Sequence, residues 1–305
     1  MDCSACGAPV EPEARFCEAC GTPIAGAVAA TNAGVSPRLD RRELDIGREL
    51  AAVSDRGLVH AQNEDAVAVL YDPPFAVMVV CDGVSSSNDP ARGSGTAADA
   101  AAQSLLEGIA TRRSPKELMR SAILAGHDAI CALMPAGTSS DDRPLTTIVA
   151  ALAGPGTVTI GWVGDSRAYL MSGGARLLTR DDSWVNWAVE HGDMTEAQAM
   201  CSPNAHVILQ CLGDPDDPPE PHIVTTALSA GERLLLCSDG LWNYAPTPSA
   251  LMARTSAFSA ATPAITMCQA LVKFANSAGG RDNITAAMLI VPDDVPRIRG
   301  NLAHA

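Results

Sequence analysis

Four apolar segments of this chain each stop or start at an aspartate, and this repetition limits the fold more than any other feature. The aspartates are Asp82, Asp165, Asp239 and Asp282. A single aspartate before glycine marks an ordinary turn. Four of them need a joint explanation, because a carboxylate removed from water without a partner is costly. Strand ends that gather at one edge of a sheet would cluster these acids, and such a cluster persists only when it is protonated or bound to cations.

The composition of the chain agrees with a cation site built from oxygen ligands. Carboxylates without His or Cys select magnesium or manganese rather than zinc. The net charge is −14, from 21 basic and 35 acidic residues. This charge disfavours nucleic-acid binding, which needs Lys and Arg to neutralise phosphates, and it disfavours docking on anionic membranes. An acidic chain still binds phosphate through metal ions held on its carboxylates.

Length and apolar content indicate one large domain, or one domain with a small appendage. The chain has 305 residues, of which 47% are hydrophobic and 18% charged, enough for a globular core. No apolar run reaches the length of a membrane span, and the N-terminus lacks the basic and apolar regions of a secretory signal. We therefore expect a cytoplasmic protein. The sequence does not indicate an oligomeric state, so a monomer is the default expectation.

Two Cys-x-x-Cys-Gly pairs in residues 1–25 predict a small zinc ribbon. The four cysteines are Cys3, Cys6, Cys17 and Cys20. Two such pairs supply a closed four-thiolate shell for one structural Zn²⁺, and the metal would provide most of the folding energy of so short a segment. The alternative is a pair of redox dithiols or disulfides, but no thioredoxin-like pattern surrounds them. One Arg against four acids in this segment argues against a nucleic-acid role.

The remainder divides into a linker at 26–47, a large domain at 48–292 and a tail at 293–305. Apolar runs joined by turn signals predict strands at 49–54, 66–70, 75–81, 146–153, 157–163, 168–171, 233–237 and 284–291. Helices are predicted at 89–110, 114–134, 184–191, 195–201 and 262–277; the second opens with the capping box Ser114-Pro-Lys-Glu117. Two long helices between blocks of hairpin-joined strands indicate an α+β fold.

Five short stretches follow one another in a distinctive order. They are Ser54-Asp-Arg-Gly57 through Asn63-Glu64-Asp65, then Cys81-Asp82-Gly83, Gly164-Asp165-Ser166-Arg167, Leu236-Cys-Ser-Asp239-Gly240 and Asp282-Asn283. This order resembles the metal-dependent Ser/Thr protein phosphatases (the PPM family, type 2C) in their bacterial form, over residues 48–292. The resemblance implies a four-layer α-β-β-α sandwich of two antiparallel sheets flanked by helices, with the zinc ribbon added at the N-terminus.

The resemblance also implies a site for two Mn²⁺ or Mg²⁺ ions, with a position for a third. Asp82 would bridge two ions, and the Gly83 carbonyl would bind the first. Glu64 and Asp65 would hold the first ion, partly through its waters. The remaining ligands would be Asp239 and Asp282 for the second ion and Asp165 for the third. A hydroxide between the ions would attack the phosphorus of phosphoserine or phosphothreonine.

Two positions depart from the family pattern. His60 stands where the family usually has a phosphate-clamping Arg, and a histidine is charged only in part near neutral pH. It is therefore either a plain loop residue or a weaker, pH-dependent phosphate contact. Asp182 stands where His often follows Asp181. Both positions bear on rate and substrate more than on metal binding.

The sequence favours a phosphatase acting on phosphorylated proteins, with a Ser/Thr kinase and its targets as expected partners. One rival is a catalytically weak or inactive regulator that uses the same fold as a protein-binding module. The other is a nucleic-acid binder acting through the zinc ribbon, which the acidic ribbon argues against.

Overall fold

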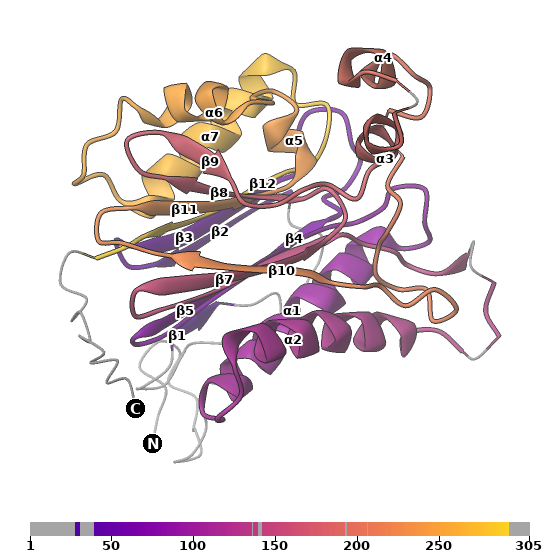
Figure 1. Cartoon of the computed structure of the whole chain (residues 1–305), viewed down its shortest axis with the longest axis horizontal. Helices are drawn as coiled ribbons and strands as arrows, with labels where there is room; N and C mark the ends of the chain where they lie inside the picture. The colour runs from indigo at the N-terminus through magenta and orange to yellow at the C-terminus, as the bar shows by residue number, and fades with distance from the viewer. Residues whose placement is uncertain are drawn as a thin grey trace.

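Two antiparallel sheets of six strands form the centre of the molecule (Figure 1). The computed structural model describes residues 28–30 and 40–292, apart from 136, 140, 141, 193 and 206. The first sheet contains, in spatial order, β1 (Val28–Ala30), β4 (Asp65–Asp72), β5 (Phe75–Asp82), β6 (Ile148–Gly154), β7 (Thr157–Val163) and β10 (His222–Ala227). The second contains β2 (Arg41–Ile46), β3 (Leu50–Asp55), β12 (Ile284–Ile290), β11 (Arg233–Cys237), β8 (Arg167–Met171) and β9 (Ala175–Leu177).

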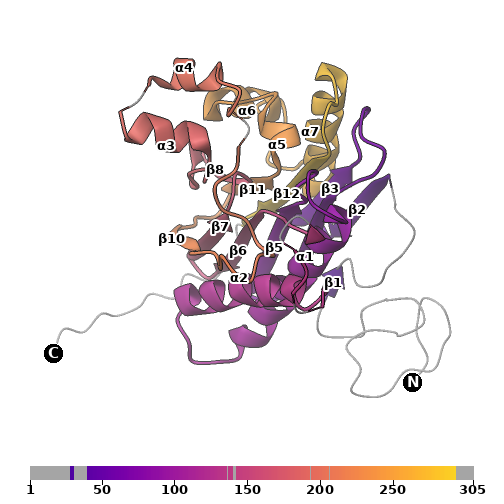
Figure 2. The same ribbon diagram turned by 90° about the vertical axis from the view of Figure 1, so that its right-hand side faces the viewer.

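Helices cover the outer face of each sheet. The helices are α1 (Pro90–Ile109), α2 (Pro115–Cys131), α3 (Trp184–Glu190), α4 (Glu196–Met200), α5 (Asp239–Trp242), α6 (Pro248–Thr255) and α7 (Ala264–Ala278). The pair α1 and α2 packs on the first sheet, and α5 to α7 lie over the second (Figure 1). Figure 2 shows α3 and α4 standing outside the layers at one end. The predicted α-β-β-α sandwich is therefore confirmed.

The strands read as continuous apolar runs because both of their faces are buried. In β4, Ala66, Ala68 and Leu70 pack under α1 and α2, whereas Val67 and Val69 point between the sheets. The strand β12 divides in the same way between the inter-sheet core and the core under α7. Full burial of one such Val or Leu contributes roughly 1.5–3 kcal/mol. Three stacked cores thus hold the strand ends, where the acids lie, in fixed positions.

The predicted capping box of α2 is confirmed. The backbone N–H of Ser114 donates to the Glu117 carboxylate at 2.8 Å, and the N–H of Glu117 donates back to the Ser114 hydroxyl at 3.3 Å. This exchange satisfies amide groups that the helix cannot pair internally. The start of α2 is therefore set by its local sequence.

The linker predicted at 26–47 is wrong for residues 28–30, which form β1, and for residues 41–46, which form β2. This strand pairs with β3 at the edge of the second sheet, with Leu44 and Ile46 buried and the charged residues between them exposed or half-buried. Half-burial explains why the stretch carries too few apolar residues to predict a strand. The zinc ribbon at 1–25 and the tail at 293–305 lie outside the described residues, and the other domain limits stay predictions. No helix in the described part is long and apolar enough to cross a bilayer.

Candidate metal centre

The acids named by the sequence come from separate elements that end at one edge of the sandwich. Asp65 begins β4 and lies directly opposite Asp82, the last residue of β5. Asp239 opens α5 immediately after β11, and Asp282 comes shortly before β12. Asp165 lies in the turn between β7 and β8. The register of β4 and β5 thus fixes the central pair of carboxylates.

One carboxylate oxygen of Asp65 accepts two hydrogen bonds, and the other has no hydrogen-bond partner among the described residues. Its Oδ2 accepts hydrogen bonds of 2.7 Å from the hydroxyls of Ser238 and Thr285. Its Oδ1 is buried and has no hydrogen-bond partner among the described residues. Burial, followed by the charges of Asp282 and Asp239, raises the pKa of Asp65 to about 7. A buried anionic oxygen with no partner is costly, so this atom is suited to a cation.

The pKa values of the other acids show that the carboxylates converge. Burial, then the charges of Asp65 and Asp239, raises the pKa of Asp82 well above its usual range. Burial, then Asp282, raises the pKa of Asp239 to about 7, although a hydrogen bond with Asp82 lowers it in part. The carboxylates therefore lie close enough to disfavour one another's ionisation.

Asp165 extends the cluster on the side of β7. Burial, followed by the charges of Asp239 and Asp181, raises the pKa of Asp165 well above its usual value. Its Oδ1 is the second buried carboxylate oxygen in the described residues that lacks a hydrogen-bond partner. The indole N–H of Trp242 donates to its backbone carbonyl at 3.0 Å and fixes the turn.

The donor set fits Mg²⁺ or Mn²⁺, since it consists of carboxylate and carbonyl oxygens with two unpartnered buried oxygens. Within the described residues, no three His, Cys, Asp or Glu side chains are already arranged closely enough to hold an ion.

Glu64 is already engaged by hydrogen bonds. Its carboxylate accepts from the Ser85 hydroxyl at 2.6 Å and from the Gln62 amide at 3.0 Å. Its carbonyl accepts from the N–H of Gly83 at 3.2 Å. A Cβ added at Gly83 would lie 2.7 Å from that carbonyl oxygen and 2.8 Å from the carbonyl of Pro90. Only glycine fits there, so Gly83 brings two strand ends together with its own carbonyl left close to Asp82.

Asn283 joins the loops around the site, and sequence reasoning gave it no role. Its Oδ1 accepts from the N–H of Glu64 at 2.7 Å, while its Nδ2 donates to the carbonyls of Arg56 and Gln62 at 2.8 and 3.0 Å. The side chain is buried. Its position directly after Asp282, in a motif at the start of a strand, was the only available signal.

His60 contacts an acid of the cluster. Its Nε2 lies 3.3 Å from Oδ1 of Asp282, and the side chains are 28% and 43% exposed. The guanidinium of Arg56 is occupied by the carbonyl of His60 and by Asp40. Arg56 therefore holds the loop rather than replacing the missing arginine.

The sequence comparisons decide the family. Residues 59–276 match the sequence profile of protein phosphatase 2C, which is more than half of the chain, and residues 3–24 match that of a zinc-ribbon domain. This chain belongs to the protein phosphatase 2C family. The predicted resemblance is thereby confirmed.

Named proteins of the 2C family match the large domain. The Ser/Thr protein phosphatase PstP of Mycobacterium tuberculosis is 29% identical over 250 residues, which cover 80% of this chain and 45% of that protein. The solved Ser/Thr phosphatase of S. agalactiae is 26% identical with a TM-score of 0.65, covering 82% of this chain and 99% of that one. The catalytic domain of PstP, solved in complex with two manganese ions, is 27% identical with a TM-score of 0.58, covering 82% and 98%. The chain spans about half the length of the curated relatives it matches.

In this member of the 2C family, Asp182 pairs with a histidine from another strand. His222 on β10 places its Nε2 2.8 Å from Oδ1 of Asp182 and stacks on Trp162. The other oxygen of Asp182 accepts from the N–H of Gly164 at 2.9 Å. The pair thus supports the turn that carries Asp165, as Trp242 also does.

Proposed function

We propose that this chain hydrolyses phosphoserine and phosphothreonine in proteins, with two Mn²⁺ or Mg²⁺ ions held by the acid cluster. The observation that carries the proposal is the convergence of Asp65, Asp82 and Asp239, whose pKa values are raised by burial and by one another. Asp82 would be shared by the two ions. The other ligands would be Asp65, Glu64 and the Gly83 carbonyl on one side, Asp239 and Asp282 on the other, with Asp165 for a third ion.

The residues of the chain prepare the site in three ways. When bound, paired divalent cations supply an activated water and polarise the phosphate oxygens. Ser238 and Thr285 fix one oxygen of Asp65 and leave the other free to bind. Asp65 and Asp239 would hold the cations as deprotonated carboxylates, because metal ligands must be deprotonated. We infer that His60, whose Nε2 lies 3.3 Å from Asp282, would contact a substrate phosphate oxygen.

Phosphorylated proteins are the proposed substrates, and a Ser/Thr kinase with its targets is the proposed partner set. The names of the relatives support the substrate class, since PstP is a Ser/Thr protein phosphatase. We take the chain to act as a monomer in the cytoplasm.

Manganese-dependent release of phosphate from a phosphothreonine peptide tests the proposal. We expect wild-type protein to turn over such a peptide with excess manganese and to lose activity with a chelator. A folded protein that shows no turnover across the neutral pH range would refute the catalytic proposal and leave the protein-binding regulator as the alternative. Every acid that two ions require is present, which favours the enzyme.

We propose further that Cys3, Cys6, Cys17 and Cys20 hold one structural zinc ion, as the zinc-ribbon match supports. Metal analysis of the full chain under reducing conditions should give one zinc per chain. Cys17→Ser with Cys20→Ser should remove it, because two thiolates do not complete a tetrahedral shell. Unchanged zinc content in that double variant would refute the zinc site.

A further inference from the structure

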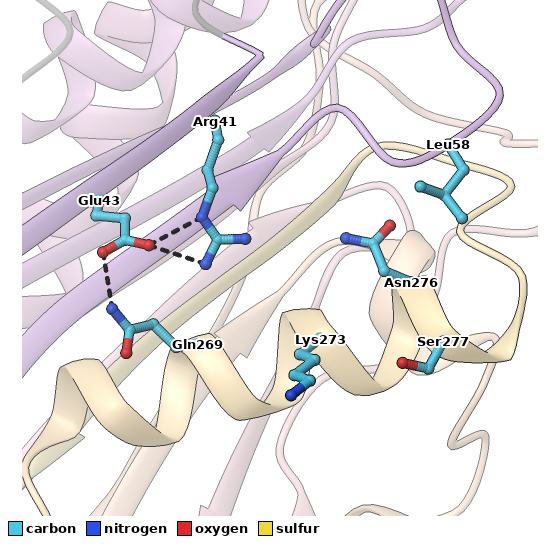
Figure 3. A pocket seen from close by; sticks show the side chains of 7 residues that line it. All are labelled: Arg41, Glu43, Leu58, Gln269, Lys273, Asn276 and Ser277. Carbon is cyan, nitrogen blue, oxygen red and sulfur yellow. Dashed lines mark hydrogen bonds and ion pairs between the residues drawn. The ribbon is translucent and has the colours of Figure 1, made fainter.

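A groove of about 560 Å³ lies between strand β2 and helix α7, beside the loop that carries His60 (Figure 3). It is lined by Arg41, Glu43, Leu58, Gln269, Lys273, Asn276 and Ser277. None of these residues belongs to the acid cluster. The groove is therefore a feature of the surface next to the candidate metal centre, distinct from the centre itself.

Lys273 supplies the one cation of the groove that has no carboxylate partner in the described residues. Arg41 pairs with Glu43 at 2.8 Å, and Gln269 donates to Glu43 at 2.8 Å (Figure 3). Arg41 also pairs with Asp55 at 2.8 Å. Lys273 is exposed and forms no ion pair there. It is also one of only two lysines in a chain of net charge −14. An unpaired ammonium in a groove favours an acidic group of a ligand.

Leu58 forms an apolar end to the groove. Its side chain is 65% exposed, and that of the adjacent Val59 is 68% exposed. The loop is nevertheless fixed, since the N–H of Leu58 donates to the carbonyl of Gly280 at 2.7 Å. Gly57 has φ +75°, and a Cβ there would lie 2.1 Å from the carbonyl oxygen of Asp282. Exposed apolar side chains on a rigid loop are typical of a contact surface.

The groove opens next to the metal centre. Leu58 precedes His60 by two residues, which span at most about 7 Å, and His60 contacts Asp282. Asp55 connects the groove floor to the same loop, because its Oδ1 accepts from the Asn276 amide and from the N–H of Gly57, both at 3.0 Å. The loop that carries Leu58 therefore adjoins the acid cluster.

We propose that this groove binds the segment of the phosphoprotein substrate that flanks the phosphorylated residue. An apolar side chain of that segment covers Leu58, and an acidic side chain beyond it pairs with Lys273. Leu58 lies against Gly280, which follows the end of α7, and Lys273 lies on α7 itself. Leu58 and Lys273 thus select substrates that carry an apolar residue and an acidic residue on the same side of the phosphorylated residue. This inference rests on the proposed function and adds the substrate class.

Two phosphothreonine peptides that differ only at the acidic position, Glu or Gln, test the groove. Lys273→Glu should raise the KM for the Glu peptide by about fivefold and leave its kcat unchanged, as expected for an exposed ion pair turned into a repulsion. The KM for the Gln peptide and for p-nitrophenyl phosphate should not change. Leu58→Ala should raise the KM for both peptides and leave that for p-nitrophenyl phosphate unchanged.

Lys116→Glu is the matched control, because Lys116 is the other lysine and is exposed on α2. The proposed role of the groove would be refuted if Lys273→Glu raised the KM equally for both peptides. It would also be refuted if Lys116→Glu raised the KM for the Glu peptide as much as Lys273→Glu does. Fluorescence anisotropy on manganese-loaded protein, with a Glu peptide that carries a non-hydrolysable phosphonate in place of the phosphate, does not depend on turnover. If the wild-type protein shows no turnover, only the proposed enzymatic function is refuted. If Lys273→Glu binds the peptide as tightly as wild type does, only the proposed role of the groove is refuted.

Discussion

Asp82→Asn is expected to abolish manganese-dependent phosphatase activity and, at the same time, to make the metal-free protein more stable above neutral pH. Catalysis of phosphoryl transfer depends almost entirely on positioning and electrostatics, so the loss should be at least about a thousandfold. The gain in stability follows from the raised pKa of Asp82, which reports repulsion from Asp65 and Asp239 as well as burial. An amide cannot ionise, so it removes that repulsion. Steady-state rates and melting temperatures in chelator measure the two effects.

Asp72→Asn is the matched control. Asp72 ends β4 and lies opposite Phe75, at the far end of the hairpin from Asp82. This variant should keep wild-type rates and wild-type stability. If Asp82→Asn retained more than about a tenth of the activity, or lost stability along with activity, Asp82 would not be the centre of a repelling carboxylate cluster.

The apolar strands and the acids at their ends were predictable because local sequence determines them. A strand buried on both faces must be apolar throughout, so β4, β5 and β12 are recognised by composition alone. The strands β2 and β10 were missed for the opposite reason. Both lie at sheet edges, where their side chains alternate with solvent or stay largely exposed. Backbone pairing with β3 and β7 determines where these two strands lie. The amino-acid sequences of the two strands give little indication of that pairing.

The supports of the candidate site were beyond sequence reasoning because they join distant residues. The hydroxyl of Ser238 reaches Asp65 across 173 positions, and that of Thr285 reaches it across 220. Each is an unremarkable residue next to a strand end. The pairing of His222 with Asp182 is similar, since a histidine on an edge strand gives no indication of its partner. The sequence thus identified the acidic residues of the candidate site, whereas the fold is needed to identify the residues that orient them.

Without metal, the protein is expected to lose stability as the pH rises from about 4 to about 7, and manganese should reverse this trend. The folded-state pKa values of Asp65 and Asp239 are both about 7, against about 3.9 for an unfolded aspartate. Across this window the folded state holds protons that the unfolded state has released, so the free energy of unfolding falls with rising pH. The loss should be on the order of a few kcal/mol.

Manganese acts in the opposite direction because it replaces those protons. Its stabilising effect should therefore be small at the acidic end of the window and largest above neutral pH, where no proton must leave. Melting temperatures in chelator and in manganese across this window measure both trends, and Asp239→Asn should flatten the metal-free curve. Metal-free protein whose stability stayed level or rose towards neutral pH would show that these carboxylates do not repel one another. Since a cluster that does not repel has no need of cations, that single curve tests the physical basis of the metal centre independently of any substrate.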